Sequence, residues 1–352
     1  MALPGLMDNA RFNAGAAARA LGWVSLAASF AVLADDPRAW LERMERALAT
    51  RNYQGTFVHE QGGQTETLRV VHRVSGAEIA ERIASLDGSG REVIRHNGEL
   101  TAYFPDQRVV LVESGPKEGL LLTELLRLDT AGSEMYRLRE ELPTRVSGRA
   151  SHVVAVEPLD DLRYGYRVWI DDASAMPLKT QLRASDGRVV EQLVFTELSL
   201  PSRIADAALQ PAVAARNYRW LRHAAPATVP ESQMPESSWE AAGLPPGFHL
   251  TANSIQMLAG ASTPVTHLVF SDGLASVSVF VEPAPRLALS RPGVTAPSTM
   301  TNVGSSSAMS TVVDGHKVTA IGEVPPATVR AIAGSLREGF GSSGRLAGGS
   351  RH

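Results

Sequence analysis

The sequence predicts an α+β protein built from two structural units. The first is an N-terminal curved antiparallel sheet, a half-barrel with helices packed on one face, and the second is a smaller C-terminal α+β unit. Two observations predict this class. Short runs rich in Val, Thr and aromatic residues fill 56–198, and Gly, Asn-Gly or Asp-Gly turn signals separate them every ~8–15 residues. A proline-bearing segment at 223–238 has no hydrophobic periodicity and is typical of a linker.

Composition excludes several classes of protein. The chain has 352 residues, 44% hydrophobic and 20% charged, with a mean hydropathy of -0.06, which excludes a polytopic membrane protein and a wholly disordered chain. The formal net charge is -3, so there is no overall positive field and we expect no nucleic-acid partner. The absence of cysteine excludes disulfides, thiolate nucleophiles, thiolate metal sites and a lipid-acceptor cysteine.

The first 34 residues have the order of a secretory signal peptide. Arg11 and Arg19 precede a mostly apolar run at 20–33, and the small residue Ala34 is followed by acidic residues. At about 14 residues the apolar run is too short to cross a bilayer comfortably. We expect cleavage after Ala34, which leaves a mature formal charge of about -4, and a soluble exported protein in the periplasm.

The N-terminal unit is predicted over 35–222. It opens with an amphipathic helix at 37–50, because Asp36 and Pro37 form a helix start and the apolar residues recur at intervals of three and four. A strongly apolar stretch at 120–128, predicted to be helical, interrupts the strands. The predicted strands are 56–60, 65–74, 78–86, 91–96, 100–104, 109–113, 151–157, 164–171, 177–184 and 189–198.

The C-terminal unit is predicted over 239–338, after the linker at 223–238. Asp-Gly turns at 272–273 and 314–315 each join two strand-like runs, which predicts two hairpins. Pro325 and Pro326 open a helix through 336 with one apolar stripe. The Gly/Ser/Arg tail at 339–352 is expected to be disordered.

A search for catalytic patterns predicts no enzyme. There is no nucleophile elbow, zinc-protease motif, Walker loop or dinucleotide loop, and Gly115-Pro116 prevents the helix that an SxxK nucleophile at Ser114 would need. His59, His72 and His96 lie on separate predicted strands, where a histidine is usually hydrogen-bonded rather than a metal ligand. We therefore expect no catalytic residue, no metal site and no cofactor.

Aromatic residues of the predicted sheet are the candidate lining of a lipid cavity. A curved sheet with one aromatic face and a helix over its mouth would enclose an apolar cavity, but the same residues would equally form a filled core. The candidates are Phe57, Tyr103, Phe104, Tyr136, Tyr166, Trp169 and Phe195.

Only three of the 34 basic residues are lysines, so nearly every cation is a guanidinium that can pair with carboxylate or phosphate, although codon bias would produce the same composition.

An ordered set of short motifs resembles a known family. Val168-Trp169-Ile170-Asp171 followed by Met176-Pro177-Leu178-Lys179 resembles a signature of the lipoprotein-carrier fold. Together with the motifs at 52–58, 243–248, 271–274, 278–282 and 322–326, it resembles the RseB/MucB family of periplasmic stress regulators over about 35–338. The Gly/Ser-rich segment at 302–307 and the basic tail depart from that pattern.

The resemblance implies a negative regulator of the sigma-E/AlgU envelope stress response. Such a protein binds the periplasmic region of a membrane anti-sigma factor of the RseA/MucA type and shields it from regulated proteolysis. A lipid-type signal, lipopolysaccharide or lipoprotein acyl chains, releases it. The resemblance implies a protein peripheral to the membrane and leaves a homo-oligomer open. The alternative is a periplasmic lipid or lipoprotein carrier, which would need only the first unit.

Overall fold

The computed structural model describes residues 36–88, 90–96, 98–114, 134–224, 239–256, 263–283 and 298–339. The predicted signal peptide, the predicted helix at 120–128, most of the linker and nearly all of the tail lie outside these residues. Among the described helices, none is long and apolar enough to cross a membrane.

The first helix, α1 (Pro37–Thr50), forms as predicted. The Asp36 carboxylate accepts a hydrogen bond from the backbone N–H of Arg38 at 3.0 Å, and proline occupies the first turn. The predicted apolar stripe is buried, which confirms that α1 packs by one face. The stripe consists of Trp40, Leu41, Met44, Ala47 and Leu48.

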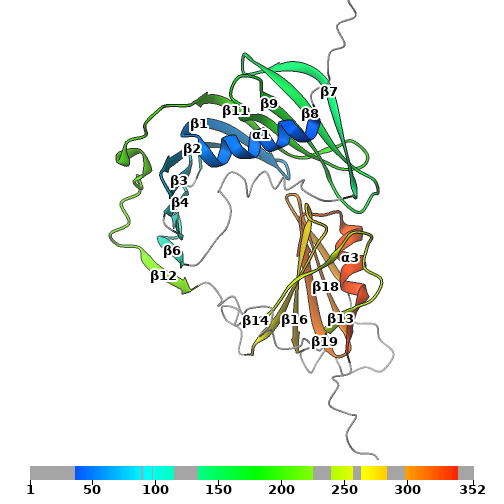
Figure 1. The fold of residues 1–352 in the computed structure, drawn as a ribbon. Helices are drawn as coiled ribbons and strands as arrows, with labels where there is room; N and C mark the ends of the chain where they lie inside the picture. Colours follow the sequence, from blue (N-terminus) through cyan, green and yellow to red (C-terminus); the bar gives the residue numbers. More distant parts are fainter. Residues whose placement is uncertain are drawn as a thin grey trace, which may run out of the picture. The chain divides into compact units, whose positions relative to one another are not determined.

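Twelve strands of the N-terminal region form one sheet, which bends continuously along the strand order (Figure 1). The order is β12-β6-β5-β4-β3-β2-β1-β11-β10-β9-β8-β7, antiparallel except for the parallel pair β12 and β6. The predicted curved antiparallel sheet is confirmed. Its strands are β1 (Tyr53–Gln61), β2 (Gln64–Ser75), β3 (Glu78–Ser85), β4 (Glu92–His96), β5 (Glu99–Phe104), β6 (Val109–Ser114), β7 (Tyr136–Val146), β8 (Arg149–Pro158), β9 (Gly165–Asp171), β10 (Pro177–Arg183), β11 (Val189–Ser199) and β12 (Arg219–Ala224).

Two strands of this sheet were not predicted, and both are edge strands. β7 is polar and contains Pro143, a composition that only an edge strand tolerates because one side of its backbone is unpaired. β12 runs through Ala224, two residues into the range predicted as linker.

The two faces of the sheet are covered by different parts of the chain. On one face, here called the α1 face, α1 packs over strands β1, β2, β8, β9 and β11. On the opposite face, the segment between β11 and β12, which includes the short helix η1 (Asp206–Leu209), packs against β2, β3, β5 and β6. Because side chains alternate along a strand, β2 contributes to both faces, with Val70 under α1 and Val71 on the opposite side.

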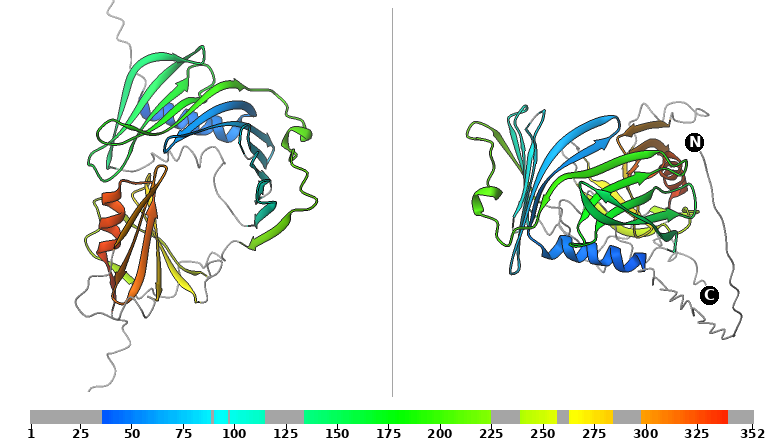
Figure 2. Two further views of the ribbon diagram at one scale, coloured as in Figure 1. Left: turned by 180° about the vertical axis from the view of Figure 1, so that it is seen from behind. Right: turned by 90° about the horizontal axis from the view of Figure 1, so that it is seen from above.

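The C-terminal region has its own six-stranded antiparallel sheet, ordered β14-β15-β16-β19-β18-β17. The helix α3 (Pro326–Ser335) buries Val329, Ile332 and Ala333 in the core of this region, as predicted. Both predicted Asp-Gly hairpins are present, between β15 and β16 and between β18 and β19. The strands are β13 (Trp239–Ala241), β14 (His249–Gln256), β15 (Val265–Ser271), β16 (Ser276–Pro283), β17 (Thr299–Val303), β18 (Ser306–Val313), β19 (His316–Gly322) and β20 (Leu336–Glu338), with β13 and β20 paired separately. Figure 2 shows α3 against this sheet from a second side.

One buried arginine bonds to residues that are distant in the sequence. Arg163 is fully buried, and its guanidinium donates to Asp160 at 3.0 Å, to Asp272 at 2.6 Å and to the carbonyl of Pro246 at 2.7 Å. Asp272 also accepts from the Tyr136 hydroxyl at 3.2 Å. A buried charge is tolerated only when it is paired and hydrogen-bonded, as this one is.

Candidate functional site

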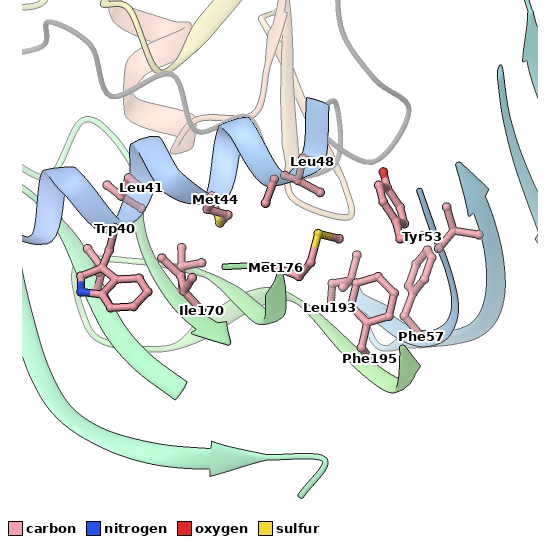
Figure 3. Packing of buried hydrophobic residues seen from close by; sticks show 14 of the residues in the cluster. Trp40, Leu41, Met44, Leu48, Tyr53, Phe57, Ile170, Met176, Leu193 and Phe195 are labelled. Atoms are coloured by element: carbon pink, nitrogen blue, oxygen red, sulfur yellow. The ribbon is translucent and has the colours of Figure 1, made fainter. Parts of the chain in front are cut away.

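The structure brings four of the seven candidate aromatic residues into one cluster. Phe57 and Phe195 are buried, at 0% and 1% exposure, and their rings lie 5.5 Å apart under α1. Tyr136 and Tyr166 pack against the same cluster at partial exposure. Figure 3 shows Leu41, Met44 and Leu48 of α1 extending toward this layer. This part of the α1 face is therefore occupied by the chain's own side chains.

The other three candidates lie elsewhere. Tyr103 belongs to the cluster on the opposite face of the sheet, with Val110 and Val112. Trp169 alternates along β9 with Val168 and Ile170, both of the α1-face core, so its side chain is directed to the opposite face. Its ring there lies 4.8 Å from Lys179 Nζ and 6.0 Å from the Arg167 guanidinium, in cation–π contact.

Phe104, the seventh candidate, lies on a second region of the α1 face. Cross-strand pairing aligns one row of apolar residues on strands β3, β4, β5, β6 and β12: Ile83, Val93, Ala102, Leu111 and Leu221. Ile83 pairs with Val70, so this row lies on the face that carries Val70 and Phe57. Phe104, opposite Val109, shares this face. We call the half-buried members of this set the apolar patch: Ile83, Val93, Leu100, Phe104, Leu111 and Leu221.

The apolar patch differs from the rest of the sheet in its packing. Among the described residues, Ile83 alone of its six members packs against a core cluster. The patch remains half-exposed on strands whose opposite face is covered by the segment before β12. A contiguous, partly exposed apolar surface of this kind is typical of a binding surface.

A row of polar side chains crosses the α1 face beside the apolar patch. Cross-strand pairing aligns Tyr53, His72, Glu81 and Arg95 on strands β1 to β4. His72 and Glu81 are completely buried, and the His72 Nδ1 to Glu81 Oε1 distance is 3.1 Å. Arg95 Nη1 lies 3.9 Å from Glu81 Oε2. We call these four residues the polar row.

In the polar row, Tyr53 Oη and His72 Nε2 are buried and have no hydrogen-bond partner in the described part of the chain. The two rings stack with centroids 4.5 Å apart and an interplanar angle of 11°. Because Nδ1 of His72 faces a carboxylate, which only accepts, that nitrogen is the donor of the pair. Burial, and secondly the charge of Glu81, raise the pKa of Tyr53 well above its ordinary value, so the phenol stays protonated.

The combination of polar row and apolar patch favours binding rather than catalysis. Buried polar atoms are nearly always satisfied in folded proteins, so a buried hydroxyl and imidazole nitrogen without partners mark the polar row as a candidate for pairing with the polar end of a ligand. The neighbouring patch can accept an apolar chain. Sequence reasoning singled out Phe104 and His72 separately, but it could not find the row or the patch, because their members come from different strands.

The three histidines considered as metal ligands do not converge. His59 contacts Glu191 at 2.7 Å, His72 contacts Glu81, and His96 contacts Glu78 at 2.9 Å. Within the described ranges no group of three or more His, Asp or Glu side chains could hold a metal ion.

Comparison with known proteins covers both regions of the chain. The family model of the MucB/RseB N-terminal domain matches residues 36–213, and that of the MucB/RseB C-terminal domain matches 233–337. The Sigma factor AlgU regulatory protein MucB of Pseudomonas aeruginosa is 32% identical over 89% of this chain and 94% of that protein. The Sigma-E factor regulatory protein RseB of Escherichia coli K12 is 28% identical over 86% of this chain and 90% of that protein.

Solved structures agree with the sequence relatives. A crystal structure of MucB in complex with MucA(peri) is 30% identical, covers 87% of this chain and 100% of that one, and has a TM-score of 0.65. A crystal structure of MucB is 28% identical, covers 86% and 98% of the two chains, and has a TM-score of 0.52. The fold, the two matched domains and the near-complete coverage of the relatives together show that this chain belongs to the MucB/RseB family.

Proposed function

We propose that this protein is a periplasmic negative regulator that binds the periplasmic region of a membrane anti-sigma factor and shields it from regulated proteolysis. The observation that carries the proposal is the family match over both regions, 36–213 and 233–337. The relatives are named sigma factor regulatory proteins, and one is solved with MucA(peri).

A lipid-type signal releases the regulator in this proposal, and the apolar patch with the polar row is its binding surface. The patch offers half-exposed aliphatic and aromatic groups to an acyl chain, and burial of apolar surface drives such binding at roughly 25 cal/mol per Å². Release follows from linkage: the lipid must bind the free regulator more tightly than the complex, and its differential affinity sets the loss of partner affinity.

The first experiment tests partner binding. The purified chain is mixed with the periplasmic region of an anti-sigma factor of the RseA/MucA type from the same genome, and complex formation and protection from the first protease of the cascade are measured. We expect a stable complex and slower cleavage. Absence of a complex with folded protein would refute the regulator proposal and leave the alternative, a periplasmic lipid carrier, which the apolar patch also favours.

The second experiment tests the lipid surface with dansyl-labelled undecanoic acid, whose fluorescence reports transfer to an apolar site. Val93 belongs to the patch, whereas its neighbour Ile94 belongs to the cluster on the opposite face. We expect Val93→Asn to abolish the fluorescence gain and Ile94→Asn to retain it, with circular dichroism showing both folded. Equal loss in the two variants would contradict the assignment of the patch.

A further inference from the structure

A pocket of about 320 Å³ lies between α1 and the turn that connects β9 to β10. One wall is formed by α1 positions 43, 46, 47 and 50 and by the residue that caps its C-terminal end, Arg51; Ala47 of this wall also belongs to the apolar stripe that faces the core. The other wall is the turn at 172–175. The pocket is lined by Trp40, Arg43, Arg46, Ala47, Thr50, Arg51, Asp172, Ala173, Ser174 and Ala175.

The charged groups of this pocket are mainly hydrogen-bond donors. Three arginines are among its lining residues: Arg43, Arg46 and Arg51. The ion pair that Arg46 forms is with Glu42 at 3.9 Å, and both side chains are more than half exposed, so the pair is weak. The Thr50 hydroxyl donates to the carbonyl of Arg46.

Trp40 also lines this pocket and carries a buried N–H donor. It is 5% exposed, and its Nε1–H has no hydrogen-bond acceptor among the described residues. In Figure 3 the indole nitrogen lies on the side of the ring away from Ile170. The ring is held between His152, stacked with centroids 3.9 Å apart, and the Arg43 guanidinium at 4.6 Å.

The one carboxylate of the pocket already has a partner. Asp172 lies 3.5 Å from Nε2 of His152, whose Nδ1 is 3.1 Å from Glu140. The pocket is therefore lined by three arginines and one carboxylate that is already engaged, a charge balance that is complementary to an anion. The carbonyls at the C-terminal end of α1 and Asp172 oppose a doubly charged phosphate more than a singly charged carboxylate.

We infer that this pocket binds a carboxylate side chain from an acidic peptide segment of the anti-sigma partner. Guanidinium forks match the planar carboxylate bidentately, and the indole N–H can donate to the same group. The chain's own tail at 339–352 contains no Asp or Glu and is excluded as the occupant. The identity of the partner rests on the proposed function; the carboxylate site does not.

An indole-specific titration tests the site without the partner. The chain has five tryptophans, so ¹⁵N-tryptophan labelling gives few indole signals, and Trp40→Phe assigns the relevant one. The probes are acetyl-triglutamate amide, acetyl-triglutamine amide and inorganic phosphate. We expect triglutamate alone to move the Trp40 indole signal downfield. A response to phosphate alone, an equal response to triglutamine, or no response would overturn the inference.

Charge reversal tests the site in the complex. Arg46→Glu/Arg51→Glu changes two exposed residues of the pocket, and Arg216→Glu/Arg330→Glu makes the same change of net charge at exposed residues outside it. We expect the first variant to weaken capture of the anti-sigma periplasmic region at least tenfold and the control less than twofold. Arg46→Gln/Arg51→Gln provides a milder second variant and should weaken capture severalfold. Equal affinities for pocket and control variants would refute the docking site, whereas failure of the unmodified chain to bind would refute the proposed function and leave the titration result standing.

Discussion

Removal of the Tyr53 hydroxyl should stabilise this protein. Tyr53 is fully buried, and Oη has no hydrogen-bond partner among the described residues. Folding therefore transfers a hydroxyl from water to an unpaired position, which costs about 1–3 kcal/mol. The ring itself packs in the core and stacks on His72, and phenylalanine keeps both contacts.

We therefore expect Tyr53→Phe to raise the free energy of unfolding by about 1–2 kcal/mol, because phenylalanine has no hydroxyl to desolvate and loses few contacts. The matched control is Tyr136→Phe, which deletes a hydroxyl that donates to Asp272 at 3.2 Å. That variant should lose about 1–2 kcal/mol, because it leaves part of the acceptor capacity of a buried carboxylate unsatisfied.

Urea unfolding followed by tryptophan fluorescence measures both variants, and thermal unfolding checks the sign. The same chemical deletion thus has opposite expected effects at two sites of one protein. If Tyr53→Phe destabilises the protein as much as Tyr136→Phe does, the Tyr53 hydroxyl is satisfied in solution, and the argument that the polar row is available to a ligand fails.

Three further outcomes follow from the structure. Burial raises the pKa of Asp171, but hydrogen bonds from Arg149 and Ser174 lower it by more, so the folded-state pKa is below the ordinary value. Asp171→Asn should cost about 1–3 kcal/mol of unfolding free energy at neutral pH. Urea titrations should show this difference between variant and unmodified protein disappearing as the pH falls through the folded-state pKa. Cleavage of the chain within 225–238 should weaken capture of the anti-sigma region at least tenfold, about 1.4 kcal/mol, in a binding titration, because one partner segment then engages two separate surfaces; undiminished binding by either fragment would contradict this. Mass spectrometry of the exported protein should give an N-terminus at Asp35, and a mass that includes residues 1–34 would refute the predicted cleavage.

Local sequence rules predicted the elements whose stability is decided locally. α1 has a cap, a first-turn proline and a period of 3.6, and each of these is visible in consecutive residues. The hairpin at Asp314-Gly315 is another case, because both residues adopt positive φ, as a two-residue turn of this kind requires. The sequence does not predict β7, which is mostly polar, or β17, which is short and mixed in composition. Both are edge strands, and pairing with one neighbour rather than residue propensity makes them strands.

The candidate site was predicted less well, because the face that a side chain occupies depends on register. Tyr103 and Phe104 are neighbours in β5, yet they lie on opposite faces, in a covered cluster and in the apolar patch respectively. Trp169 is separated in the same way from Val168 and Ile170. Residue type alone points to these aromatic residues, but strand pairing, which composition does not encode, decides which of them meet.

The polar row connects the two surfaces to which we assign binding. Tyr53 lies in the core cluster that contains Leu48 of α1, and from it the row leads through His72 and Glu81 to Arg95, beside the apolar patch. α1 in turn presents its arginine stripe to the pocket at the β9–β10 turn. A ligand on the patch that pairs with Tyr53 thus contacts the same packed layer that positions the pocket. Packed layers of this kind transmit a shift only if they have two arrangements that both ligands distinguish. The resulting coupling is reciprocal: if binding of the anti-sigma segment weakens lipid binding, then lipid weakens binding of the segment by the same factor.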